Sequence, residues 1–136
     1  MATAHDALAR LVEAADDGRL DALCERRHVR IMCAFGSATE PDIPDPHDLD
    51  VAIAFEPGSG GDVLALWNEL YELCGPVELD LMDLDRARPV ARANGLVGVP
   101  LYERRRGEFA RAQTLALAKR MDTRWLRLLD RRLRAG

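Results

Sequence analysis

The sequence predicts one α/β domain, residues 1–136, with a small mixed β-sheet, helices on one face of the sheet and a long C-terminal helix. Residues 48–55 and 77–84 alternate apolar and polar side chains, as half-buried strands do. Residues 29–35 are almost continuously apolar, as in a strand buried on both faces. Elsewhere, apolar residues recur at helical spacing, and a chain of 136 residues is long enough for only one core.

Residues 1–27 are expected to form a helix or a broken pair of helices. Apolar side chains recur at helical spacing up to Ala15, and the spacing resumes at Leu20. Gly18 lies between the two runs and interrupts them, because glycine is a poor helix former.

Residues 28–102 are expected to form the central part of the domain. The strand at 29–35 precedes a loop, because Pro41, Pro44 and Pro46 each fix φ and lack an amide donor. The next strand, 48–55, is expected to be half-buried. One of its faces carries Leu49, Val51, Ile53 and Phe55, and the other carries Asp48, Asp50, Ala52 and Ala54.

A helix and a third strand follow in the predicted order. Apolar residues recur at helical spacing after the Gly-rich turn at 57–61, until Gly75 and Pro76 end the helix. The strand at 77–84 has Val77, Leu79 and Leu81 on one face and Glu78, Asp80 and Met82 on the other.

Residues 97–103 predict a short edge strand, since Pro100 cannot donate a ladder hydrogen bond. The basic segment 103–136 predicts a long amphipathic helix over 107–133. Residues 1–102 carry 8 Lys and Arg against 19 Asp and Glu, whereas the basic segment carries 11 against 4. Such asymmetry can mark a nucleic-acid surface, and it can equally mark a solvated helix face or a docking face for an acidic partner. Nucleic acid is not expected, because aromatic residues make up only 5% of the chain, too few for a stacking platform interleaved with the arginines.

The cysteines and the chain ends indicate a cytoplasmic protein. Cys24, Cys33 and Cys74 are odd in number and widely spaced, which favours reduced, buried thiols over disulfides or a zinc site. The N-terminus lacks a basic segment followed by an apolar one, and no apolar run approaches the ~20 residues that span a bilayer. No membrane partner is expected.

Two carboxylates open the strand at 48–55. Asp48 and Asp50 project from the same face about 6.5 Å apart, beside small alanines. Their repulsion is relieved by a divalent cation, and Mg²⁺ is typically held by one or two carboxylates together with substrate phosphates. Asp80, on the matching face of another strand, supplies a third carboxylate. Gly36 and Ser37 end the first strand, where a backbone amide and a hydroxyl can approach a phosphate closely.

This constellation resembles the DNA polymerase β-like nucleotidyltransferase superfamily. Gly36-Ser37, then Asp48-Leu49-Asp50-Val51, then Leu79-Asp80-Leu81 on a later strand occur in the order that the superfamily shows. The small size is similar to that of its minimal nucleotidyltransferase branch. The resemblance covers residues 29 to about 102, and more loosely the C-terminal helix.

The resemblance implies a reaction and a role for each motif residue. Two Mg²⁺ ions, replaceable by Mn²⁺, are held by Asp48, Asp50 and Asp80, and Asp80 also helps to deprotonate the acceptor. Gly36 and Ser37 hold the β and γ phosphates of ATP or another nucleoside triphosphate. A nucleoside monophosphate, AMP in the case of ATP, passes to an acceptor hydroxyl by two-metal catalysis.

The resemblance also implies a partner. Many members of the minimal branch are antitoxins that modify, or simply bind, a HEPN-type toxin. The alternatives are nucleotidyl transfer to a small, aminoglycoside-like acceptor, or a non-catalytic antitoxin that binds its toxin by contact alone. This sequence departs from the common pattern at Ala38 and His47, where many members have arginine and serine. The oligomeric state, homo-oligomer or hetero-oligomer, is left open.

Several of these residues have a second interpretation. Glu78 shares the face of Asp80 and is the alternative third ligand. Asp83 or Asp85 is interpreted as a helix N-cap, because charged residues follow them. His47 is interpreted as an exposed loop residue, with a role at a metal or phosphate as the alternative.

Two aromatic features of the helices also have more than one interpretation. Trp67 and Tyr71 are interpreted as core packing, with an aromatic stack for a ligand as the alternative. In the C-terminal helix, the region around Trp125 and Leu129 either packs on the body or, in our hypothesis, docks a protein partner.

Overall fold

The structure is a computed structural model that describes residues 3–135; in the C-terminal helix it leaves the side chains of residues 122–127, 129–130 and 133–135 undescribed. The elements follow one another in the order α1 (Ala4–Asp16), α2 (Arg19–Arg26), β1 (Val29–Phe35), a short 3₁₀ helix η1 (Ser37–Thr39), β2 (Asp48–Phe55), α3 (Val63–Cys74), β3 (Glu78–Asp83), α4 (Pro89–Gly95), β4 (Val99–Glu103) and α5 (Glu108–Ala135).

The four strands form one mixed sheet in the order β3-β2-β1-β4. Strand β1 pairs antiparallel with both β2 and β4, whereas β2 and β3 are parallel. The parallel pair requires a crossover, which α3 provides. Strand β4 lies at an edge and carries Pro100, as the sequence predicted.

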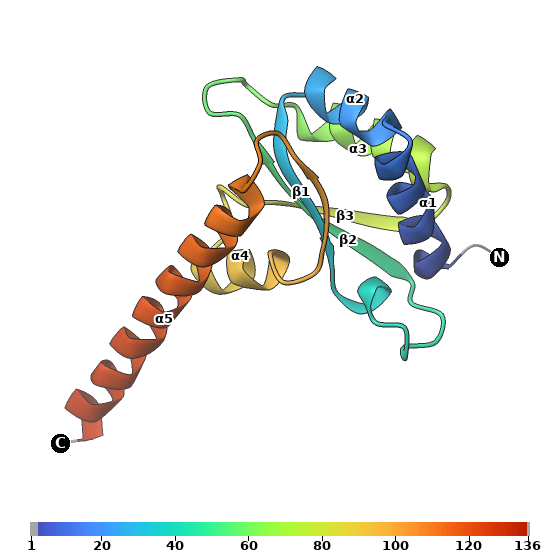
Figure 1. Cartoon of the computed structure of the whole chain (residues 1–136). Helices are drawn as coiled ribbons and strands as arrows, with labels where there is room; N and C mark the ends of the chain where they lie inside the picture. Colours follow the sequence, from blue (N-terminus) through green and yellow to red (C-terminus); the bar gives the residue numbers. More distant parts are fainter. Residues whose placement is uncertain (1–2, 136) are drawn as a thin grey trace.

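Helices cover both faces of the sheet, which corrects the expectation of helices on one face. Helices α1, α2 and α3 lie on one side of the sheet, and α4 and α5 lie on the other (Figure 1). Ala52 and Ala54, expected on an open face of β2, are fully buried under α4 and α5. Their small side chains allow this close packing: a Cβ at Gly95 would lie 3.1 Å from the Cβ of Ala52. The half-buried pattern of β2 therefore holds only at its first residues, Asp48 and Asp50.

Local signals account for the helix boundaries. Thr3 and Asp6 form a capping box at the start of α1. Gly18 adopts φ +90° and separates α1 from α2, so the broken pair of helices is confirmed. The predicted N-cap at Asp83 or Asp85 is wrong, because α4 starts later, after Arg88. The Asp83 carboxylate instead accepts a hydrogen bond from the Asp85 amide at 3.0 Å and closes a turn.

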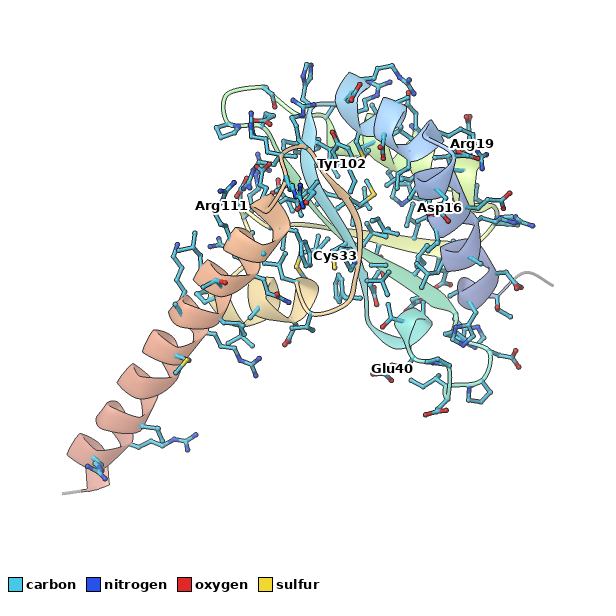
Figure 2. All side chains as sticks on the ribbon, in the orientation of Figure 1. Asp16, Arg19, Cys33, Glu40, Tyr102 and Arg111 are labelled. Atoms are coloured by element: carbon cyan, nitrogen blue, oxygen red, sulfur yellow. The ribbon has the colours of Figure 1, made fainter. Side chains whose placement is uncertain are left out.

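The three cysteines are free and buried, as expected. Cys33 lies on β1 in the middle of the molecule (Figure 2). Burial raises the pKa of its thiol to about 11, so at neutral pH the thiol keeps its proton.

Helix α5 extends well beyond the body of the molecule (Figure 1). Its first turns pack on α4 and the sheet through Phe109, Ala112 and Ala116. Other large apolar side chains of the helix are exposed: Leu115, Leu117, Met121 and Leu128. The side chains of Trp125 and Leu129, the centre of the docking hypothesis, lie outside the described residues. Within the described chain, no helix combines the length and the apolar character needed to cross a membrane.

Candidate functional site

Four carboxylates meet where β2 and β3 begin. The parallel register sets Asp48 beside Glu78 and Asp50 beside Asp80. Neighbouring strands lie about 4.8 Å apart, and residues two apart on a strand about 6.5 Å apart. The four side chains therefore form a compact array on one face of the sheet, at one end of two adjacent strands.

The end of β1 completes the site from the other side of β2. Phe35 is the antiparallel partner of Asp50, so Gly36 follows directly beside the carboxylate array. A Cβ built at Gly36 would lie 2.6 Å from Oδ2 of Asp50, and Gly36 adopts φ +80°. Only glycine adopts this positive φ without strain and leaves room for the Asp50 carboxylate. The chain needs glycine here because the backbone passes so close to the Asp50 carboxylate.

A tight turn follows Gly36. The amide of Thr39 donates to the Gly36 carbonyl at 3.1 Å, and the Thr39 hydroxyl donates to the same oxygen at 2.7 Å. Ser37 begins η1 directly after Gly36 and is partly exposed. Glu40 follows the turn at the outer edge of the molecule (Figure 2).

The array carries uncompensated negative charge. Burial raises the pKa of the Asp50 carboxyl, and the nearby charges of Asp80 and Asp48 raise it further. Hydrogen bonding with the Asp48 side chain raises the pKa of Glu78. Among the ion pairs found in the described chain, none involves these four carboxylates. A cation bound here would therefore neutralise charge that the protein leaves unpaired.

The donor set fits a hard divalent cation. Carboxylate oxygens are the ligands that Mg²⁺ prefers, and Asp48, Asp50 and Asp80 offer them on one face. Glu78 lies in the same array, so the register does not choose between Asp80 and Glu78 as a third ligand. As the described side chains stand, no three His, Cys, Asp or Glu residues converge closely enough to hold one ion between them. Binding would require small rotations of these side chains.

The segment that carries the Gly36 turn and the carboxylate array contains no cationic Lys or Arg side chain of its own. The sequence contains no Lys or Arg between Arg30 and Arg86. Ala38, which stands where many members of the resembling family have arginine, is buried at 3% exposure. His47, next to Asp48, is exposed, as the sequence predicted.

Helix α3 supports β3 from the opposite face of the sheet. The indole Nε1 of Trp67 donates to the carbonyl of Leu79 at 2.7 Å, one residue before Asp80. The ring of Trp67 also stacks on Tyr71, with centroids 5.0 Å apart. Both aromatics therefore serve packing, as expected, and Trp67 in addition anchors the strand that carries Asp80.

Sequence reasoning missed His5, which lies on α1. Its Nδ1 is 3.0 Å from the carbonyl oxygen of Ala38, and its Nε2 is 2.8 Å from that of Ile43. Both carbonyls belong to the loop that joins Gly36 to Asp48. No sequence signal indicates this contact, because His5 precedes its partners by more than thirty positions, 33 and 38 residues.

Comparison with known proteins extends the description of the fold. No family model matches the sequence, and no curated protein gives a significant match. Among solved structures, a toxin–antitoxin with AMP-PNP superposes with a TM-score of 0.66 at 14% identity, over 88% of this chain and 98% of that chain. The chain has the nucleotidyltransferase fold.

Two further neighbours agree with this fold. The toxin–antitoxin MntA-HepT gives a TM-score of 0.61 at 14% identity, over 88% of this chain and 97% of that chain. A variant of the same pair, with two aspartates changed to glutamate, gives a TM-score of 0.64 at 14% identity, over 88% of this chain and 98% of that chain. The predicted fold class is confirmed. At this identity the likeness concerns the fold alone, and function has to be argued from the site.

Proposed function

We propose that this protein is a metal-dependent nucleotidyltransferase that transfers a nucleoside monophosphate, AMP from ATP, to a hydroxyl of a HEPN-type toxin and acts as the antitoxin of that pair. The observation that carries the proposal is the register of Asp50 beside Asp80, with Gly36 against the Asp50 carboxylate. A carboxylate array beside a glycine turn provides metal ligands and a phosphate approach in one place.

Each site residue has a role in this proposal. Asp48, Asp50 and Asp80 hold Mg²⁺, which when bound neutralises the charge that develops on the phosphate oxygens. Gly36 and Ser37 bind the β and γ phosphates, which leave together as pyrophosphate, through a backbone amide and a hydroxyl. Asp80, exposed on the edge strand β3, also accepts the proton of the acceptor hydroxyl.

Two features of the structural neighbours support the nucleotide and the partner. One neighbour is a toxin–antitoxin with AMP-PNP, an ATP analogue. Another carries changes at two aspartates that are two positions apart, the spacing of Asp48 and Asp50 here. The toxin as acceptor follows from the same likeness; a small, aminoglycoside-like acceptor is the alternative substrate.

Helix α5 is the proposed docking element for the toxin. Leu117 and Met121 are 41% and 70% exposed, and Leu128 lies further along the helix at 45%. Leu117 and Met121 are four residues apart and Leu128 seven further, so the three share one face of the helix. Basic residues surround this stripe, so the toxin surface that it contacts is expected to be apolar with an acidic rim.

A second candidate function has its own support. The absence of Lys and Arg between Arg30 and Arg86 leaves the triphosphate with few cationic partners from this chain. A non-catalytic antitoxin that neutralises its toxin by contact requires no such partners. The two candidates differ in whether a covalent adduct forms on the toxin.

The test is transfer to the co-purified toxin in the presence of Mg²⁺ and ATP. We expect intact-mass spectrometry to show the gain of an adenylyl group with the wild-type chain. Asp80→Asn should lower the rate at least about a hundredfold, while nucleotide affinity changes less, because the lost group acts mainly in the transition state. Asp85→Asn removes a carboxylate outside the array and is the matched control.

Three other outcomes are informative. Equal rates for Asp80→Asn and the wild type would exclude Asp80 and point to Glu78. No adduct, together with neutralised toxin activity, would favour the non-catalytic antitoxin. An adduct on a small hydroxylated compound but not on the toxin would favour the alternative substrate.

A further inference from the structure

His5 joins the first turn of α1 to the loop that precedes the carboxylate array. Its two ring nitrogens face two different carbonyl oxygens, that of Ala38 at 3.0 Å and that of Ile43 at 2.8 Å. The neighbouring amide of Ala4 donates to the carbonyl of Pro46 at 3.1 Å. Three contacts from one helical turn thus fix the start, the middle and the end of the loop.

The geometry at His5 requires a particular protonation state. A carbonyl oxygen only accepts hydrogen bonds, so each ring nitrogen of His5 must donate one. Neutral imidazole carries a single N–H, whereas imidazolium carries two. Both contacts can therefore be made only by the protonated ring, and loss of the proton leaves a nitrogen lone pair facing a carbonyl oxygen.

The surroundings of His5 favour that proton. The hydrogen bond to the Ile43 carbonyl raises the pKa of His5 most, followed by the one to Ala38, and partial burial opposes them. Charged groups on both sides act in the same direction. Asp6 lies on the same helix, and Asp45 lies in the loop packed against the ring.

The loop held by His5 connects the two halves of the candidate site. Gly36 and Ser37 are the first residues of this loop, within two residues of Ala38, and Asp48 is the first residue after it. Its other charged side chains are acidic and exposed. The position of the Gly36-Ser37 turn relative to β2 therefore depends on how this loop is tied to α1.

We propose that His5 is a positioning residue whose imidazolium holds residues 36–47 in the conformation that presents Gly36 and Ser37 to the phosphates of the nucleotide. The nucleotide part of this inference rests on the proposed function; the link between His5 and the loop does not. In its neutral form His5 keeps one of the two bonds, and the turn loses part of its fixed position.

The direction of the pH dependence follows from linkage. A histidine whose folded-state pKa is raised stabilises the folded arrangement fully below its unfolded pKa of about 6.5, and this contribution is lost as pH rises through the folded value. The loop should therefore be held tightly at pH 6 and more loosely at alkaline pH. Nucleotide affinity should fall over the same interval.

The first test concerns the loop and uses no nucleotide. In the wild-type chain, NMR titration should show His5 releasing its proton at higher pH than in the same chain unfolded in urea. Amide hydrogen exchange of residues 38–46, corrected for its intrinsic pH dependence, should rise as His5 deprotonates. A normal titration of His5, or loop exchange that is independent of its protonation, would overturn the proposal. Both measurements use the wild-type chain, so they do not depend on the folding of a variant.

The second test measures binding of AMP-PNP with Mg²⁺ from pH 6 to 9 by calorimetry. His5→Gln keeps one donor but cannot titrate, so we expect its affinity to be lower than that of the wild type at pH 6 and the two to converge at alkaline pH. At pH 6 the wild type should bind about 2- to 10-fold more tightly than His5→Gln, which corresponds to the free energy of one ordinary hydrogen bond. Protonation of the nucleotide and of Asp50 affects both chains equally and cancels in the ratio.

A matched variant controls for the loss of a histidine. His28 is exposed at the opposite end of β1 with φ +61°, which asparagine tolerates, so His28→Asn should bind as the wild type does at every pH. A constant ratio between His5→Gln and the wild type across the pH range would overturn the positioning role. If neither chain binds the nucleotide at any pH, the proposed function fails, while the exchange experiment still decides whether His5 holds the loop.

Discussion

Asp50 lies where three segments of the chain meet. Strand β3 brings Asp80 beside it, β1 brings Phe35 and then Gly36 to its other side, and Asp48 precedes it on the same face. Partial burial and like charges raise the pKa of its carboxyl, which means that the folded chain tolerates the charged form poorly. A residue held at a cost to stability is typical of a functional site.

This cost leads to a prediction for the metal-free protein. Because the folded-state pKa of Asp50 is raised, the folded state holds the carboxyl proton more tightly than the unfolded state does. Stability therefore falls as pH rises from the unfolded pKa of Asp50 to its folded pKa. Asp50→Asn should therefore stabilise the metal-free chain at pH 7, by at most about 1 kcal/mol after solvent screening. The gain should vanish below pH ~3.9, where the carboxyl is protonated even in the unfolded chain. Urea unfolding at pH 7 and below pH ~3.9 measures this gain in the free energy of unfolding. A variant that is less stable than the wild type at pH 7 would contradict the proposed state of Asp50.

Gly36 allows a second residue-scale prediction with a close control. Gly36 and Gly58 adopt similar left-handed φ values, +80° and +74°, but an added Cβ would meet Asp50 only at Gly36 and nothing within 4 Å at Gly58. The atom that it meets is the mobile end of the Asp50 side chain, so the carboxylate should move aside. Gly36→Ala and Gly58→Ala should each lose about 1–3 kcal/mol of stability, because a side chain is strained at these positive φ values.

Binding should separate the two alanine variants. A displaced Asp50 carboxylate should weaken Mg²⁺-nucleotide binding by Gly36→Ala about tenfold or more, because small displacements of ligating groups are costly. Gly58→Ala should bind as the wild type does. Equal affinities of the two variants in calorimetry would show that the close approach of Gly36 to Asp50 has no role in the site.

At the scale of elements, the two ends of α5 have different surroundings. Ala116 is buried against the second face of the sheet, whereas Met121, five residues later, is 70% exposed on the part of the helix that leaves the body. An exposed apolar stripe on a projecting helix contributes little to the stability of the chain itself. Its apolar surface is available to a partner.

Met121→Glu tests this docking surface. Glutamate is a good helix former and Met121 is exposed, so the free energy of unfolding should change by no more than about 0.5 kcal/mol. Affinity for the toxin should fall about fivefold or more, because a charge replaces an apolar contact and repels an acidic rim. Leu64→Glu is the control, since Leu64 is also 70% exposed but lies on α3, on the opposite face. If both variants bind the toxin equally well, the docking surface lies elsewhere.

Most elements were predictable because their signals are local. Gly18 separates two helices, Pro100 marks an edge strand, and alternation places Asp48 and Asp50 on one face of β2. The coverage of the second face was not predictable in this way. Ala52 is consistent both with an open face and with a closely packed helix, and only the approach of Gly95 from α4 distinguishes them.

The candidate site was predictable to the extent that it follows from register. A carboxylate motif on β2 and one on β3 become neighbours once the two strands pair in parallel, so Asp80 and Glu78 could both be named as partners of the β2 carboxylates. His5 could not, because its role depends on where α1 packs against a loop more than thirty residues away. Contacts between distant segments without a spacing pattern leave no signal in a single sequence.

At the scale of the whole molecule, acidic and basic parts are separated. The body that carries the carboxylate array is strongly acidic, and the basic residues concentrate in α5, which extends away from it. Without a cation, the array adds to the repulsion within the body. Binding of Mg²⁺ with a nucleotide at the array should therefore stabilise the whole chain by mass action.

The most direct test of the account is calorimetric titration of the full chain with AMP-PNP in the presence of Mg²⁺, beside the variant that carries both Asp48→Asn and Asp50→Asn. The wild type should bind, and the binding should disappear when EDTA removes the metal. The double variant should show no detectable binding, although it folds with equal or greater stability in the metal-free state. Binding of equal affinity by the two chains, or binding by the wild type that survives EDTA, would contradict the claim that these carboxylates hold a metal-bound nucleotide.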